Sequence, residues 1–135
     1  FKLEKNSEPV NNVVHEIISS QASLHGKYGG VVPELAAREH IKNLPLLVSD
    51  ACEQAKVELS DLTAIAVTQG PGLKGCLLVG VSFAKALAHS LQIPLIPVHH
   101  LEAHIFSGFL LKKEEQPEYP FLTLLVSGIS NILTI

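Results

Sequence analysis

The chain has 135 residues, of which 47% are hydrophobic and 17% are charged, and its formal net charge is −3. This length suits one packed domain and is too short for two ordinary ones. The weak negative charge argues against a basic surface spread evenly for nucleic acid, and the hydrophobic content argues against a disordered acidic tail. No apolar run reaches the roughly 18–20 residues that a membrane span needs, so we expect no membrane contact.

The first half of the chain predicts a strand, a loop and a long helix. Residues 10–20 are rich in β-branched side chains and predict a strand. The glycines of residues 26–30 predict a loop. Pro33 suits the first turn of a helix that continues to residue 55 with apolar residues at helical spacing. Pro45 lies inside this pattern, so we expect a kink or a break near residues 43–44.

The second half predicts further alternation. Residues 64–68 form a continuous apolar run, typical of a strand that is buried on both faces of a parallel sheet. A helix rich in small residues is expected over 77–91, then a strand over 93–98, and a helix that opens at His99 or His100. Apolar residues 121–126 predict a third strand, and residues 131–135 predict the start of a return strand. Alternating strands and helices predict an α/β domain.

Two cysteines, Cys52 and Cys76, lie in stretches that predict helix, without a CxxC spacing. Buried, reduced thiols of a cytosolic protein are therefore expected.

A glycine-rich turn, Gly70-Pro71-Gly72-Leu73-Lys74-Gly75, connects a predicted strand to a predicted helix. It is not a P-loop, because Cys76 follows Gly75 where that motif has Ser or Thr. Two interpretations stay open: a tight turn with close backbone packing, or backbone amides that contact an anionic ligand. The pair Ser127-Gly128, which follows a predicted strand, has the same two interpretations. Lys74 either meets an anion or is solvated.

His100 and His104 have the spacing of metal ligands. Residues i and i+4 of a helix lie on one face, one turn apart, so both imidazoles can reach one divalent ion. The spacing alone is common, and a helical histidine is more often packed or solvated than bound to metal. The position of the pair directly after a short apolar strand favours a metal site.

Three segments carry a resemblance to a known family. Residues 28–40 read YGGVVPELAAREH, residues 70–73 read GPGL, and residues 97–104 read PVHHLEAH. Together, in this order and spacing, they resemble the bacterial and organellar branch of the TsaD family. Its members are tRNA N6-adenosine threonylcarbamoyltransferases, formerly described as O-sialoglycoprotein endopeptidases. The resemblance covers roughly residues 17–128. It implies an actin-like ATPase fold, which sugar kinases share. Residues 1–135 would form one partial domain of that fold, mainly its N-terminal lobe.

The resemblance implies transfer of threonylcarbamoyl from threonylcarbamoyl-AMP to N6 of adenosine 37, in tRNAs that read codons beginning with A. His100 and His104 match metal ligands of the family, for one divalent ion, iron or zinc. Residues Leu125, Val126, Ser127 and Gly128 match the strand and turn that contact the substrate. Implied partners are tRNA, a paralogous actin-like subunit, a small ATPase subunit of the modification complex, and a second copy of the chain. A cytoplasmic location is implied, or a mitochondrial one in a eukaryote.

The sequence also departs from the family. In the family, a Glu-Thr-Ser-Cys-Asp phosphate loop precedes the region that matches Phe1. A C-terminal lobe with a metal-binding aspartate follows the region that matches the end of this chain. After Ser127-Gly128 the family has Gly-His-Thr-Gln, where this chain has residues 129–132, ISNI. We therefore expect a truncated or interrupted sequence that is inactive alone.

Two alternative functions stay open. One is another metal-dependent carbamoyltransferase of the same superfamily, and the segment at residues 28–36 argues against it. The other is a non-catalytic partner subunit, and retention of His100 and His104 argues against that. A metalloprotease is disfavoured because HxxxH lacks the glutamate of HExxH. Glu34 and Arg38 are expected to form a surface charge pair on the helix, with a role in the chemistry or in a lobe or subunit contact as the alternatives.

Overall fold

A computed structural model describes residues 13–110, 113–126 and 131–134. The chain divides into two compact units. One is formed by Val14–Ala103, and the other contains the described residues from His104 onward. The described residues combine helices with short strands, as the α/β prediction required. None of their helices is both long and apolar enough to cross a lipid bilayer.

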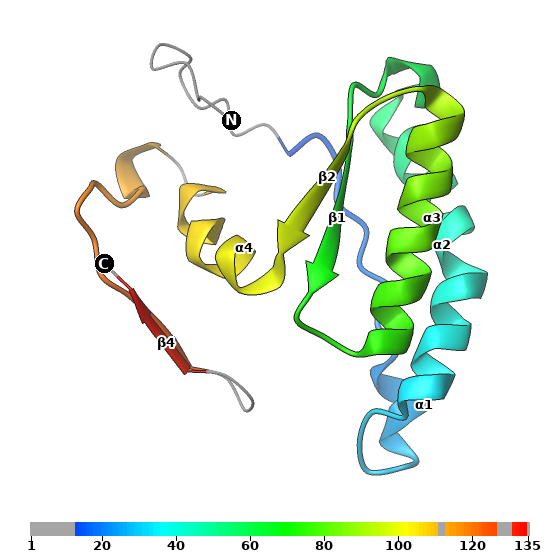
Figure 1. Cartoon of the computed structure of the whole chain (residues 1–135), viewed down its shortest axis with the longest axis horizontal. Coiled ribbons are helices and arrows are strands. Elements are labelled where there is room, and N and C mark those ends of the chain that lie inside the picture. Colours follow the sequence, from blue (N-terminus) through cyan, green and yellow to red (C-terminus); the bar gives the residue numbers. More distant parts are fainter. Residues whose placement is uncertain (1–12, 111–112, 127–130, 135) are drawn as a thin grey trace. The chain divides into compact units, whose positions relative to one another are not determined.

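The first unit is built on a parallel β-α-β element. Strand β1 (Ile65–Gly70) leads into helix α3 (Lys74–Leu91), and the chain returns in strand β2 (Leu95–His99), which pairs with β1 in parallel (Figure 1). Ile65 lies opposite Leu95, and Gly70 lies opposite His99 after an irregularity in the register. Parallel neighbours require such a crossover, so the predicted alternation of residues 64–98 is confirmed.

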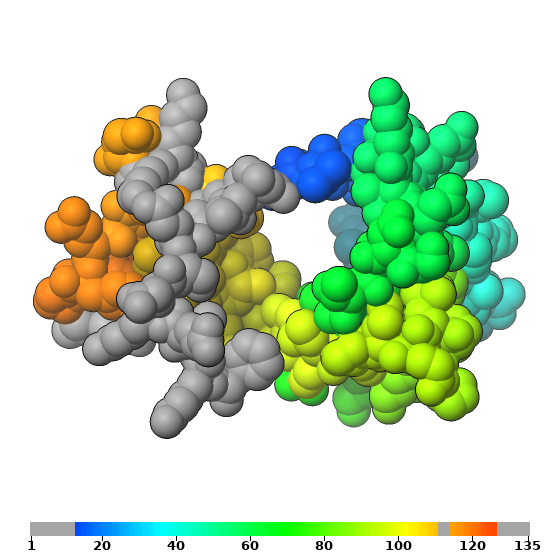
Figure 2. Space-filling view, turned by 90° about the horizontal axis from the view of Figure 1, so that it is seen from above, coloured from blue at the N-terminus to red at the C-terminus, as the bar shows by residue number. Residues whose placement is uncertain are grey.

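Helix α2 (Pro33–Ala55) packs beside α3, on the same side of the strands (Figure 1). In space-filling form the cyan atoms of α2 lie directly against the green atoms of the β-α-β element (Figure 2). The buried side chains here are small: Ala36 of α2, and Ala84 and Ala88 of α3. Small side chains let two helix axes approach closely, which explains the run of Ala, Gly and Ser in residues 77–91.

We expected a kink or a break near residues 43–44. The break is wrong, because α2 continues through Pro45 without interruption, and the kink stays a prediction. A proline removes one backbone hydrogen bond, and the ring of Pro45 stands on an exposed position of the helix. The packing of α2 against α3 stabilises the helix enough to offset that loss.

The strand predicted over residues 10–20 is absent from its described part, residues 13–20. Val13, Val14 and Ile18 are instead strongly exposed. A strand is stable only when its backbone pairs with a neighbour, and no described strand pairs with this segment. A short helix that the sequence did not predict, α1 (Ala22–Gly26), follows it.

Strand β1 is not buried on both faces, contrary to the expectation for residues 64–68. Ile65 and Val67 are half-buried, whereas Ala66 and Thr68 are exposed. Among the described residues, α3 packs against β1 and covers one of its faces. The alternation of half-buried and exposed residues along β1 therefore follows from a sheet that is covered on one side.

The second unit contains an antiparallel hairpin. Strand β3 (Thr123–Val126) pairs with β4 (Asn131–Thr134), with Val126 opposite Asn131. This confirms the strand predicted within residues 121–126 and the return strand after it. Short 3-10 helices precede the hairpin at Ser107–Leu110 and Lys113–Glu115, and another lies in the first unit at Leu59–Asp61.

Candidate functional site

Helix α4 (His100–Phe106) directly follows β2 and carries both predicted metal ligands. His100 is its first residue and His104 lies in its last turn, so the helix that the metal prediction requires is present. Imidazoles four residues apart on a helix are one turn from each other on the same face. Among the described residues no group of three or more His, Cys, Asp or Glu side chains is arranged to hold a metal. The metal site therefore stays a prediction, to which α4 contributes two ligands.

His99 ends β2 immediately before this helix. Its Nδ1 atom is buried and has no hydrogen-bond partner among the described residues. A buried nitrogen without a partner costs about 1–3 kcal/mol, so such groups are rare in folded proteins. His99 lies opposite Gly70, the first residue of the glycine-rich turn. The end of β2 thus places a hydrogen-bonding group beside that turn.

The glycine-rich turn is shaped by close packing at one of its ends. Gly70 has φ +154°, a conformation that side chains rarely adopt. A Cβ atom at Gly75 would lie only 3.3 Å from Cβ of Ala37 on α2. The interpretation of close backbone packing is therefore confirmed for Gly75. Contact of the turn with an anion is not tested and stays a prediction.

A cavity of about 780 Å³ opens inside the first unit beside this turn. Its walls come from the glycine-rich turn, from β1, from the ends of α1, α2 and α3 that lie near the turn, and from the start of α4. The volume falls within the ~300–1,000 Å³ that small-molecule sites commonly have. The side chains that line it and can form hydrogen bonds are Ser19, Gln21, His25, His40, Thr68, Cys76 and His100.

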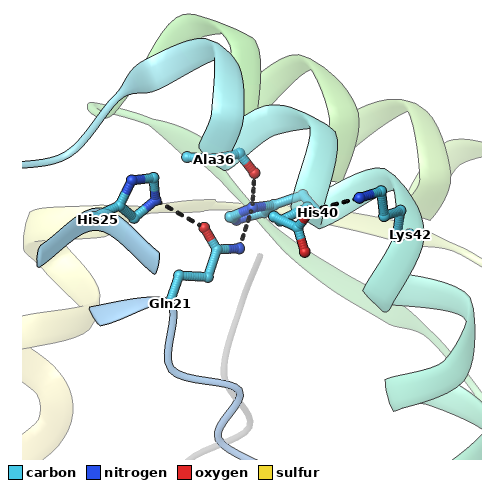
Figure 3. A network of polar contacts seen from close by, with 6 residues as sticks. Gln21, His25, Ala36, His40 and Lys42 are labelled. Atoms are coloured by element: carbon cyan, nitrogen blue, oxygen red, sulfur yellow. Dashed lines mark hydrogen bonds and ion pairs between the residues drawn. The ribbon is translucent and has the colours of Figure 1, made fainter. Parts of the chain in front are cut away.

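Three of these polar side chains form one network that ties α1 to α2 (Figure 3). The Gln21 amide lies between the two imidazoles, with Oε1 3.2 Å from His25 Nε2 and Nε2 3.2 Å from His40 Nδ1. His40 Nδ1 also lies 2.7 Å from the carbonyl oxygen of Ala36. His25 is only 6% exposed, and its Nδ1 accepts a hydrogen bond of 3.3 Å from the backbone N–H of Val32.

The sequence did not assign a role to Gln21, His25 or His40. Two signals were present: His40 closes the segment of residues 28–40 that carries the resemblance, and Gln21 and His25 stand four residues apart just before it. Neither signal could reveal that the intervening turn brings these three side chains together.

The remaining predicted residues have simpler surroundings. Arg38 donates a 2.8 Å hydrogen bond to Glu34 one turn away, and both side chains are largely exposed, which confirms the expected surface ion pair. Cys52 and Cys76 are free thiols, as predicted, but they are half-buried rather than fully buried.

The predicted substrate segment is described only in part. Leu125 is half-buried and Val126 is exposed at the end of β3. Ser127 and Gly128 lie outside the described residues, so their predicted contact with substrate is untested.

Comparison with known proteins gives a consistent result. Residues 12–134 match the family described as "TsaD: tRNA N6-adenosine threonylcarbamoyltransferase". The chain is similar to two proteins named tRNA N6-adenosine threonylcarbamoyltransferase. It is 49% identical over 116 residues to the one from Clostridioides difficile, and 54% identical over 119 residues to the one from Phocaeicola vulgatus. These matches cover 86% of this chain and 34% and 35% of the relatives. The chain thus spans about a third of the length of the curated relatives that it matches.

Proposed function

The chain belongs to the tRNA N6-adenosine threonylcarbamoyltransferase family, and from this membership we propose that the complete protein transfers threonylcarbamoyl from threonylcarbamoyl-AMP to N6 of adenosine 37 in tRNA. The observation that carries the proposal is the match over residues 12–134, which includes all three segments of the resemblance. The recipient tRNAs are those that read codons beginning with A. The chain forms part of the N-terminal lobe of an actin-like ATPase fold, and its small parallel sheet with helices α2 and α3 is compatible with that lobe.

His100 and His104 hold one divalent metal ion, iron or zinc, in this proposal. Neutral imidazole nitrogens are ligands that both metals accept, and one continuous helix carries both residues. The residues present therefore fit such an ion as part of its ligand shell. When bound, a metal of this kind acts as a Lewis acid that polarises a carbonyl group. The chain itself would supply the two ligands from one helix that directly follows β2.

The segment Leu125–Gly128 orients the adenylate. Val126 pairs with Asn131, so the pairing of β3 with β4 fixes the end of β3. A substrate held by a fixed backbone reacts faster, because little conformational freedom is left to lose in the transition state.

Partner subunits bind the outer surface of α2 and α3. The groove between these helices has a volume of about 310 Å³ and is almost entirely apolar. Two of its side chains, Ile41 and Leu78, are 61% and 69% exposed. Exposed apolar grooves of this kind commonly mark protein interfaces. The proposed occupants are a paralogous actin-like subunit or a second copy of the chain, in a cytoplasmic complex that also contains a small ATPase subunit.

A reconstituted reaction tests this proposal. The complete protein, its partner subunits, threonylcarbamoyl-AMP and unmodified tRNA are combined, and the nucleosides of the tRNA are then analysed by mass spectrometry. We expect threonylcarbamoyl-adenosine to form at position 37. No threonylcarbamoyl product from this mixture, together with carbamoyl transfer when carbamoyl-adenylate replaces threonylcarbamoyl-AMP as the donor, would assign the chain to another carbamoyltransferase of the superfamily.

A further inference from the structure

No charged side chain lines the cavity of the first unit among the residues that the structure describes. None of its lining residues is Asp, Glu, Lys or Arg, although Lys74 belongs to the adjoining turn. A buried phosphate or carboxylate needs a cation or several hydrogen-bond donors to offset its loss of hydration. The wall is mainly apolar, with Val31, Leu73 and Leu77 among its members. Among the described residues, the lining therefore suits a neutral group with apolar surface better than an anion.

The network of Figure 3 fixes the orientation of the Gln21 amide. A backbone N–H can only donate, so the Nδ1 atom of His25, which faces the N–H of Val32, is an acceptor. A neutral imidazole carries its hydrogen on the other nitrogen, so His25 Nε2 donates to Gln21 Oε1. If the amide were flipped, its N–H groups would face His25 Nε2. Both ring nitrogens of His25 would then have to accept hydrogen bonds, but a neutral imidazole has only one nitrogen that accepts.

This orientation leaves the amide nitrogen of Gln21 without an acceptor in the network. A carbonyl can only accept, so His40 Nδ1, at 2.7 Å from the oxygen of Ala36, carries a hydrogen and donates it. Gln21 Nε2, at 3.2 Å from the same ring nitrogen, therefore faces another donor. Half-buried in the cavity wall, Gln21 has N–H groups available for an acceptor atom inside the cavity.

We propose that this cavity binds a purine base, with the Gln21 amide nitrogen donating a hydrogen bond to a ring nitrogen of that base. A purine is neutral, has apolar ring faces that match the apolar lining, and carries ring nitrogens that can accept a hydrogen bond from Gln21. The inference rests on the proposed function, because both substrates of that reaction contain adenine: the adenylate and the adenosine of the tRNA. His100 lines the same cavity, so the base is bound beside a proposed metal ligand.

Binding measurements on the complete protein test this role without any turnover. Adenosine 5′-monophosphate and an anticodon stem-loop RNA with 2-aminopurine at position 37 are titrated separately, in the absence of threonylcarbamoyl-AMP. Gln21→Glu keeps the oxygen that accepts from His25 and places an acceptor next to His40 Nδ1, so its fold should be preserved, which circular dichroism checks. Gln92→Glu is the matched control, because Gln92 donates to His89 on the exposed end of α3.

We expect Gln21→Glu to weaken purine binding about tenfold, since it replaces a donor with an acceptor, and Gln92→Glu to leave binding unchanged. Loss of affinity for the monophosphate alone assigns the cavity to the adenylate, and loss for the RNA alone assigns it to the tRNA adenosine. A folded Gln21→Glu protein that binds both probes as tightly as the wild type would overturn the proposal.

A second measurement needs no variant. The 1-deaza, 3-deaza and 7-deaza analogues of adenosine each lack one ring nitrogen, and we expect one of them to bind the wild-type protein about tenfold more weakly than adenosine. Equal binding of all three analogues, or no binding of adenosine, contradicts the proposal. These readouts are independent of catalysis. A protein that binds purine through Gln21 but forms no modified nucleoside would contradict the proposed function alone.

Discussion

Gly75 in the first turn of α3 lies directly against Ala37 of α2, where a Cβ atom at position 75 would come within 3.3 Å of Cβ of Ala37. Gly80, five residues later in the same helix, has more room, because its nearest neighbour would be 4.0 Å from an added Cβ. The contact with Ala37 therefore leaves little space for a side chain at position 75, whereas position 80 can accommodate a methyl group.

We predict that Gly80→Ala stabilises the protein by about 0.5–1 kcal/mol, since alanine favours the helix and the site has space. Gly75→Val should destabilise it by roughly 1–3 kcal/mol, because the helices cannot separate without losing packing elsewhere. Urea denaturation of the complete protein measures both. Equal effects at the two positions would contradict the close contact of α2 with α3 at Gly75.

The sequence predicted the β-α-β element because its signals are local. Residues 64–98 carry apolar runs, glycines and a small-residue helix that determine their own secondary structure. Residues 13–20 failed as a predicted strand for a non-local reason: a β-branched run becomes a strand only beside a partner, and none of the described strands supplies one. Pro45 does not interrupt α2, because the packing of this helix in the fold outweighs the local preference of proline against a helix interior.

The candidate site divides in the same way. The spacing of His100 and His104 is a property of one helix and could be read from the chain. The network of Gln21, His25 and His40 depends on how the turn between α1 and α2 folds back, and no periodic pattern encodes such a turn.

A metal analysis tests the role of α4. We predict that His100→Ala and His104→Ala each lower the affinity of the complete protein for iron or zinc by more than about tenfold, because the remaining ligands cannot complete the coordination shell. His89→Ala provides the control, since His89 is exposed in the last turn of α3. Elemental analysis of the purified proteins gives the stoichiometry. Unchanged metal content in both α4 variants would show that these histidines are not ligands.

The groove between α2 and α3 yields a prediction about assembly. Leu78→Asp, which places a charge in this exposed apolar groove, should weaken association with a partner subunit or a second copy by at least about tenfold. Leu46→Asp is the matched control, because Leu46 is 64% exposed on α2 but does not line the groove. Light scattering and pull-down of the paralogous subunit measure the effect. Equal loss of association in both variants, or none in Leu78→Asp, would place the interface elsewhere.

The transfer of threonylcarbamoyl to tRNA is tested most directly in cells. The complete gene is depleted in a strain with no second copy, and the nucleosides of total tRNA are quantified by mass spectrometry. We predict that threonylcarbamoyl-adenosine disappears and that the wild-type gene restores it, whereas the His100→Ala gene does not. A normal level of this nucleoside after depletion would contradict the proposed function.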